Sequence, residues 1–362
     1  MSCSLHAAAL VVLFICDFGA CGTAAGEPAP APDASPVAAV VETTLGTSGG
    51  QIRQFAFDGD ETSFFASSQP PGRDDHFTLV LDAPVSARSI AVFTGRSDGS
   101  ERLESGVLEV SVDGKTFNEL ANFTDGAARG KPGVPKIRAV RIRPQRDHVH
   151  ALAIREISID AEPAVTTYRF PVEFTVDTSD APEMREWAEK TARICERAWP
   201  MLNDELRSDG FRPPQRVSMT LKSRYRGVAA TSGDRIVGSV RFFKEHPDDV
   251  GAMVHEAAHV VQHYTKGDNP GWLVEGVADY VRFFKFEPGN LGPIDPERAH
   301  YNGSYRVTAA FLAYLVAKYD KDVVLKLNQR MRDGKYKDEA FQELTGKPLE
   351  ELDEEWRATL KR

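Results

Sequence analysis

The chain has 362 residues, with 53 acidic against 44 basic side chains and a formal net charge of −9. Its composition, 41% hydrophobic and 27% charged, excludes a wholly disordered, collagen-like or coiled-coil protein. At about 150 residues per domain, this length predicts two domains. The acidic balance argues against a nucleic-acid partner, because binding to phosphates needs a basic face that displaces counterions.

The first 25 residues have the pattern of an export signal. Residues 7–20 are almost all apolar and too few to span a bilayer, and small residues follow them. Two interpretations stay open. A signal peptide is cleaved near Ala25, or a bacterial lipobox ends at Cys21, which would then carry a lipid anchor. Both predict a protein that is secreted or held in the cell envelope, periplasmic or extracellular, and the second makes it a lipoprotein.

Residues 26–46 are rich in alanine and proline and predict a linker, because proline stiffens a segment that has few large apolar groups to pack. From 47 to 160 the pattern changes to short alternating or apolar runs separated by Gly and Asp turns. This spacing predicts an all-β sandwich. Its expected strands lie at residues 76–81, 89–93, 107–112, 139–143 and 153–159.

Four segments of this region, 57–64, 108–117, 140–143 and 154–159, resemble a discoidin-like (coagulation-factor type C) domain, a jelly-roll sandwich. The resemblance implies a surface that binds a glycan or another cell-surface polymer through loops at one end. The chain departs from the vertebrate pattern, since no cysteine pair clamps the domain ends and Phe64 stands where tryptophan is commoner. A sandwich that only spaces or shields its neighbour stays the alternative.

Residues 161–167 predict a second, short linker, and 168–362 predict a domain of α+β class. Strands are expected at 168–176, 217–221 and 235–242, with a helix at 181–206 after the first of them. Helical periodicity beyond these strands predicts five helices, at residues 249–264, 271–285, 303–318, 321–332 and 347–361. Cys195, on the apolar face of the first helix, is expected to be a buried core thiol.

The segment His255-Glu-Ala-Ala-His259 carries the strongest chemical signal in the chain. Residues four apart lie on one face of a helix, so the two imidazoles can bind one metal ion. Glu256 then points beside the ion toward a bound water, as a zinc hydrolase requires. Asp248 or Asp249 is expected to cap the N-terminus of this helix.

The histidine that follows this motif does not supply the third ligand. The rise of 1.5 Å per residue puts His263 about 12 Å along the helix axis from His255, too far to share the metal. We expect His263 to be a polar or supporting residue. Gln262 and Thr265 occupy the places where a metzincin needs Gly and His, which excludes that class.

Glu275, sixteen residues beyond His259, is the predicted third ligand. A turn rich in Gly and Asn at 266–271 lets the second helix fold back against the first. Asp279 lies one turn beyond Glu275 and is expected to accept a hydrogen bond from the non-ligating nitrogen of His255. This Glu-x-x-x-Asp arrangement resembles that of the gluzincins, the thermolysin-like metallopeptidases.

Residues 255–262, followed by 270–282, resemble the plant basic secretory protein family, predicted zinc peptidases that also occur in bacteria. Residues 305–312 fit that family's later segment, and the resemblance covers about 168–360. It implies a zincin-like fold, one Zn²⁺ ion, and hydrolysis of peptide bonds in a protein or glycoprotein substrate. Despite the family's name this chain is acidic, so the name predicts nothing about charged partners.

In this interpretation zinc would polarise the scissile carbonyl and lower the pKa of its water toward 7, with Glu256 as general base. Tyr305 is the first candidate donor to the oxyanion, and Tyr301 and His300 are alternatives. Two interpretations of the strand at 235–242 stay open: an edge to which an extended peptide adds as a further strand, or a plain strand of the sheet. Two other functions stay open: a catalytically inactive zincin-like binding or structural protein, and a zinc hydrolase of a non-peptide bond.

Overall fold

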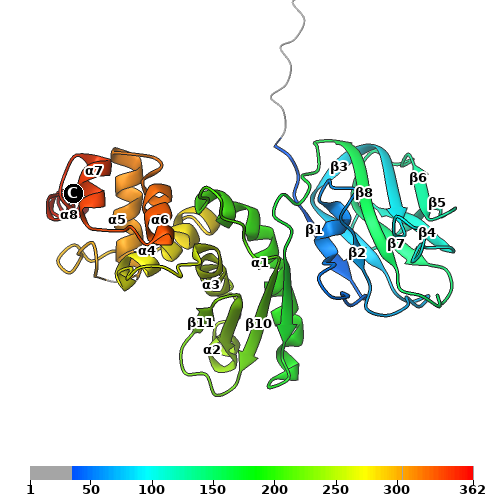
Figure 1. Ribbon diagram of the computed structural model, residues 1–362, viewed down its shortest axis with the longest axis horizontal. Helices are drawn as coiled ribbons and strands as arrows, with labels where there is room; N and C mark the ends of the chain where they lie inside the picture. The colour runs from blue at the N-terminus through cyan, green and yellow to red at the C-terminus, as the bar shows by residue number, and fades with distance from the viewer. Residues whose placement is uncertain (1–34, 304, 362) are drawn as a thin grey trace, which may run out of the picture. The chain divides into compact units, whose positions relative to one another are not determined.

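The computed structural model describes residues 35–303 and 305–361. They form an antiparallel β-sandwich followed by a domain with a four-stranded sheet and helices (Figure 1). The export signal, the lipid anchor predicted at Cys21 and the start of the Ala/Pro-rich linker lie outside these residues. Within them, no helix combines the length and the hydrophobicity that crossing a membrane would take.

The sandwich is organised around one long strand, β3, that belongs to both layers. The first part of β3 pairs with β1 and β7, and after a register shift between Val80 and Val85 the second part pairs with β8 and β6. The two strands predicted at 76–81 and 89–93 are therefore the two halves of β3. The strands of this domain are β1 Ala39–Thr43, β2 Phe65–Ala66, β3 Phe77–Thr94, β4 Gly106–Ser111, β5 Asn118–Asn122, β6 Ala127–Gly130, β7 Ile137–Pro144 and β8 Ala153–Glu162.

The predicted linker at 26–46 was wrong at its end. Residues Ala39–Thr43 form β1, pair antiparallel with β3, and bury Ala39 and Val41 in the core of the sandwich. The β-branched residues Val40, Val41 and Thr43 favour a strand and outweigh the Ala/Pro composition of the preceding segment. At the other end, Tyr168 still belongs to the sandwich core, and its Oη donates to the carbonyl of Ala39.

The second domain contains a four-stranded sheet in the order β11-β12-β10-β9. Strands β9 (Glu173–Asp177), β10 (Arg216–Lys222) and β12 (Arg235–Ser239) are parallel, and the edge strand β11 (Ala229–Ser232) runs antiparallel to β12. Of the two interpretations of the strand at 235–242, the structure supports a plain strand of the sheet and not its edge, because β12 lies between β11 and β10. The chain leaves that strand at Ser239, whose hydroxyl accepts from the backbone N–H of Phe242 and begins a short helix.

Helices α1 and α3 both contact this sheet and each other, and α4 packs on α3 and α5 (Figure 1). A π-helical turn, Arg282–Phe286, continues α4 to the end of the predicted helix at 271–285. Helices α2 and α7 were not predicted. The helices of the described chain are α1 Arg185–Glu205, α2 Val240–Glu245, α3 Gly251–Gln262, α4 Gly271–Val281, α5 Tyr305–Lys318, α6 Val323–Asp333, α7 Glu339–Thr345 and α8 Leu349–Leu360.

The predicted cap of the motif helix was also wrong. Helix α3 begins at Gly251 without a side-chain cap, and Asp249 instead forms an ion pair with Arg282, Oδ1 to Nη2 2.5 Å. The expected fate of Cys195 is confirmed, because this residue is fully buried in the core of the domain. Burial raises the pKa of its thiol, so the thiol stays protonated and unreactive at neutral pH.

Helices α4 and α5 approach each other closely at Gly276, next to the predicted ligand Glu275. A Cβ atom at Gly276 would lie 2.1 Å from Cγ2 of the fully buried Thr308 on α5. No side chain fits at that separation, so the small residue sets the spacing of the two helices.

We expect Gly276→Ala to lower the free energy of unfolding by about 1–3 kcal/mol. The strain of overpacking exceeds the helix propensity that alanine adds, roughly 0.5–1 kcal/mol. Urea denaturation followed by circular dichroism measures the change. Gly271→Ala, in the same helix and with no atom within 4 Å of the added Cβ, is the matched control and should not destabilise the fold. Equal stability of both variants would contradict the packing argument.

Candidate metal centre and active site

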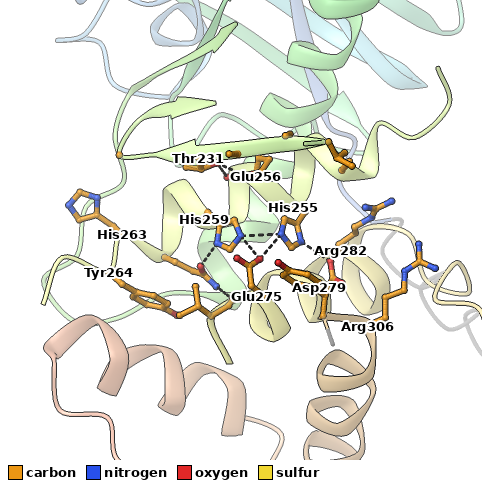
Figure 2. A pocket seen from close by; sticks show the side chains of 18 of the residues that line it. Thr231, His255, Glu256, His259, His263, Tyr264, Glu275, Asp279, Arg282 and Arg306 are labelled. Atoms are coloured by element: carbon orange, nitrogen blue, oxygen red, sulfur yellow. Dashed lines mark hydrogen bonds and ion pairs between the residues drawn. The ribbon is translucent and has the colours of Figure 1, made fainter. Parts of the chain in front are cut away.

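Helices α3 and α4 bring three ligand-type side chains together (Figure 2). The Nε2 atoms of His255 and His259 lie 3.0 Å apart, and Oε2 of Glu275 lies 3.1 Å from the first and 3.0 Å from the second. These three residues are the group of the described chain whose ligand atoms converge closely enough to hold a metal ion. The geometry thus places the three predicted ligands at one point.

Two hydrogen bonds determine where the protons of these imidazoles lie. His255 Nδ1 is 2.7 Å from Oδ1 of Asp279, and His259 Nδ1 is 2.7 Å from Oε1 of Gln262. The amide nitrogen of Gln262 donates to the carbonyl of Val274, so its oxygen must face the ring. Since both partners are acceptors, each Nδ1 is the ring nitrogen that carries a proton, and each Nε2 faces Glu275.

This donor set fits a zinc ion. Two lone pairs and a carboxylate oxygen about 3 Å apart repel one another unless a positive charge lies between them. Tetrahedral zinc with ligands at 2.0–2.1 Å holds neighbouring ligand atoms about 3.3 Å apart, close to the observed separations. Two histidines and one glutamate also leave a fourth coordination position open, the pattern of catalytic rather than structural zinc sites.

The pKa shifts of His255 and Glu275 also indicate a site that favours positive charge. Burial alone would lower the pKa of His255, but its hydrogen bonds to Asp279 and Glu275 outweigh this and raise it to about 9. Burial alone would raise the pKa of Glu275, but hydrogen bonds from His255 and His259 lower it to about 2. A proton reduces the repulsion between only two of the three atoms, whereas one metal ion can bind all three together.

Glu256 lies beside the three converging side chains and is 7% exposed. The hydroxyl of Thr231, on the edge strand β11, is 2.7 Å from its Oε2 atom (Figure 2). The carboxylate is therefore hydrogen-bonded through one oxygen, while the residue still lines the cavity in front of the histidines.

The cavity has a volume of about 990 Å³ and is bordered by elements from across the domain. The edge strand β11 forms one wall, α3 and α4 form the floor, and the first residues of α5 close one end. Arg282 and Arg306 both line it, and Arg282 is paired with Asp249 and Glu287. The cavity runs along a strand edge and does not form a closed apolar pocket.

The three candidate oxyanion donors lie in different places. Tyr305 lines the cavity, is 52% exposed, and has its ring 6.2 Å from that of His255. The negative charge of Glu275 raises the pKa of its phenol, which therefore stays a hydrogen-bond donor at neutral pH. His300 and the backbone N–H of Tyr301 bind the carboxylate of Asp353 instead, away from the residues that line the cavity.

Two residues of the site, Gln262 and Thr231, were missed by sequence reasoning. Gln262 orients His259, although the sequence analysis used it only to exclude the metzincin class. Its i+3 spacing from that histidine could have predicted the contact. Thr231 gave no signal, because it reaches Glu256 from a strand that was not predicted. His263 ends α3 in a left-handed conformation, φ 44°, and is exposed at the cavity rim.

Solved structures of family 32 carbohydrate-binding modules from Clostridium perfringens match about one third of this chain. The first module of a family 31 glycoside hydrolase has 17% identity and a TM-score of 0.29, over 33% of this chain and 92% of that chain. The NanJ module, in complex with galactose, has 13% identity and a TM-score of 0.29 over the same shares. A module in complex with GalNAc-β-1,3-galactose has 18% identity and a TM-score of 0.28, over 33% and 94%.

A search of curated proteins finds no match to this chain. The model of the family described as "Peptidase of plants and bacteria" (BSP) matches residues 158–356. The matched segment is more than half of the chain and includes the three converging side chains, Glu256 and Asp279. The chain therefore belongs to this peptidase family, as the sequence resemblance predicted.

We expect Gln262→Leu to weaken Zn²⁺ binding by about 10- to 100-fold. The substitution removes the acceptor that holds the His259 proton on Nδ1, and partners of this kind typically contribute such factors to metal affinity. Competition with a chromogenic chelator, with Zn²⁺ as the probe, measures the dissociation constant. Gln342→Leu, at an exposed position on α7, is the control. Identical affinities for the two variants would show that this hydrogen bond does not support the site.

Proposed function

We propose that this protein is an exported zinc-dependent metallopeptidase of gluzincin type. One observation carries the proposal. In a chain of a peptidase family, the lone pairs of His255, His259 and Glu275 converge within 3.1 Å, and the carboxylate of Glu256 lies beside them. This combination has the ligands for one Zn²⁺ ion and a separate acid–base group.

The residues divide the chemistry among them. His255, His259 and Glu275 would hold the ion, and Asp279 keeps the His255 ring in the tautomer that a metal ligand needs. When bound, zinc supplies Lewis-acid polarisation of the scissile carbonyl and lowers the pKa of a coordinated water. Glu256 accepts the proton of the attacking water and passes it to the leaving amine. The phenol of Tyr305 is the donor to the developing oxyanion.

The edge strand β11 favours a peptide substrate over a non-peptide one. Ala229, Ala230 and Thr231 line the cavity from the free edge of the sheet, where backbone N–H and C=O groups are available for pairing. An extended peptide can add to such an edge as a further strand, and its scissile bond then lies in front of the histidines. A hydrolase of small molecules would be served better by a closed apolar pocket.

Glu256 also argues against the inactive alternative. It would not ligate the metal, and burying its carboxylate costs desolvation energy. A purely structural metal site does not need this residue. The function of the sandwich stays a prediction from the sequence resemblance: binding of a glycan or another cell-surface polymer. Export, and a lipid anchor at Cys21, also stay predictions from the first 25 residues.

The first experiment measures metal content and cleavage together. We expect about one zinc per chain in the wild type and in Glu256→Gln, with cleavage of an unstructured protein lost by about 10²- to 10⁴-fold in the variant, since a general base contributes factors of this size. A strong chelator should abolish wild-type cleavage, and added Zn²⁺ should restore it. Glu354→Gln, at an exposed position on α8, controls for the charge change.

The other outcomes separate the alternatives. Zinc bound in both proteins without cleavage of any peptide would exclude the peptidase and leave the non-peptide hydrolase or the binding protein. Absence of zinc after reconstitution would exclude the metal centre itself. Equal cleavage by Glu256→Gln and the wild type would remove Glu256 from the mechanism.

A further inference from the structure

We propose that Thr231 is a positioning residue that aims the general base Glu256, and that it links this base to the strand on which the substrate lies. The inference rests on the proposed peptidase function and adds a residue that neither the motif nor the family resemblance assigns. It starts from one contact between the edge strand β11 and helix α3 (Figure 2).

The contact is short and involves two of the three acceptor oxygens of Glu256. Oγ1 of Thr231 lies 2.7 Å from Oε2 of Glu256 and 2.9 Å from its backbone carbonyl oxygen. A hydroxyl has a single proton, and an ionised carboxylate is the stronger acceptor of the two. In the described part of the chain, this hydroxyl is the side-chain donor that the structure provides for the Glu256 carboxylate.

Burial makes this donor important. Glu256 is 7% exposed, and a buried carboxylate is stable only when hydrogen bonds replace its lost water. The bond to Oε2 supplies one of them and fixes the rotation of the carboxylate about its last side-chain torsion. The other oxygen, Oε1, stays available to accept the proton of a water in the cavity.

The location of Thr231 gives the contact its second consequence. β11 is the free edge of the sheet, and Thr231 lies on it between Ala230, which lines the cavity, and Ser232. A peptide that pairs with this edge is placed relative to β11, whereas the ligands are placed relative to α3 and α4. The hydrogen bond of Thr231 therefore connects the strand that would place the peptide to the helix that carries the general base. A displacement of about 1 Å between such groups can lower the rate as much as 100-fold.

The same contact could serve only to attach the strand to the helix, and the test must separate these roles. Thr231→Val removes the hydroxyl and keeps the shape and strand propensity of the side chain. Thr231→Ser keeps the hydroxyl and removes the methyl group. Thr175→Val is the matched control: Thr175 is a half-buried threonine of β9, at the other edge of the same sheet, and its hydroxyl bonds a backbone carbonyl.

All variants are compared in the full chain with the wild type and Glu256→Gln, by kcat, KM, zinc content and thermal unfolding. We expect Thr231→Val to lower kcat by about 10- to 100-fold with KM and zinc content unchanged. Thr231→Ser should stay within a few-fold of the wild type, and so should Thr175→Val. An unchanged kcat in Thr231→Val, while Glu256→Gln is inactive, would overturn the proposal. Loss of zinc in Thr231→Val, or a loss of kcat in Thr231→Ser equal to that of the valine variant, would also overturn it.

A second measurement does not depend on catalysis. The urea midpoints of wild type, Thr231→Val, Glu256→Ala and the double variant form a double-mutant cycle. If the hydroxyl holds the carboxylate, the double variant shifts the midpoint by less than the sum of the single shifts. Additive shifts would overturn the proposal even if no substrate is found. A zinc-loaded wild type that cleaves nothing would instead count against the proposed function, and the cycle would still decide on Thr231.

Discussion

The candidate metal centre depends on three atoms held about 3 Å apart, the Nε2 atoms of His255 and His259 and one carboxylate oxygen of Glu275. Two imidazole nitrogens and a carboxylate oxygen repel one another at this distance unless a proton or a metal ion lies between them. The protein accepts this arrangement because hydrogen bonds on the far side of each ring prevent it from turning away. Asp279 holds His255 and Gln262 holds His259, so hydrogen bonds within the protein orient both rings without the help of an ion.

The fold supplies this organisation by bringing α4 close to α3. The amide of Gln262 donates to the carbonyl of Val274, the residue before Glu275, while its oxygen orients His259. One side chain of α3 thus fixes a ligand on its own helix and the position of the helix that carries the third ligand. On the other side of α4, Gly276 lets α5 approach, which places Tyr305 at the cavity.

Sequence reasoning located the residues whose geometry depends on helical spacing. His255, His259, Glu275 and Asp279 follow the i, i+4 rule within two neighbouring helices, so their convergence needed one further assumption, a turn between the helices. It failed where contacts with distant segments of the chain determine the local structure. Asp249 pairs with Arg282, thirty-three residues away, and does not cap α3. The strand β11 has four residues, of which only Thr231 favours a strand, and it is fixed by pairing with β12, which its own sequence does not reveal.

The edge strand β11 relates the position of a bound peptide to the groups proposed for catalysis. A metal site built on two helices can hold an ion without reference to a substrate, but hydrolysis requires the base, the ion and the scissile bond in one frame. In the proposed mechanism, α3 and α4 would hold the ion and the base, and the free edge of β11 would hold the peptide. The hydrogen bond from Thr231 on that edge to Glu256 would then limit the movement of the base relative to the peptide.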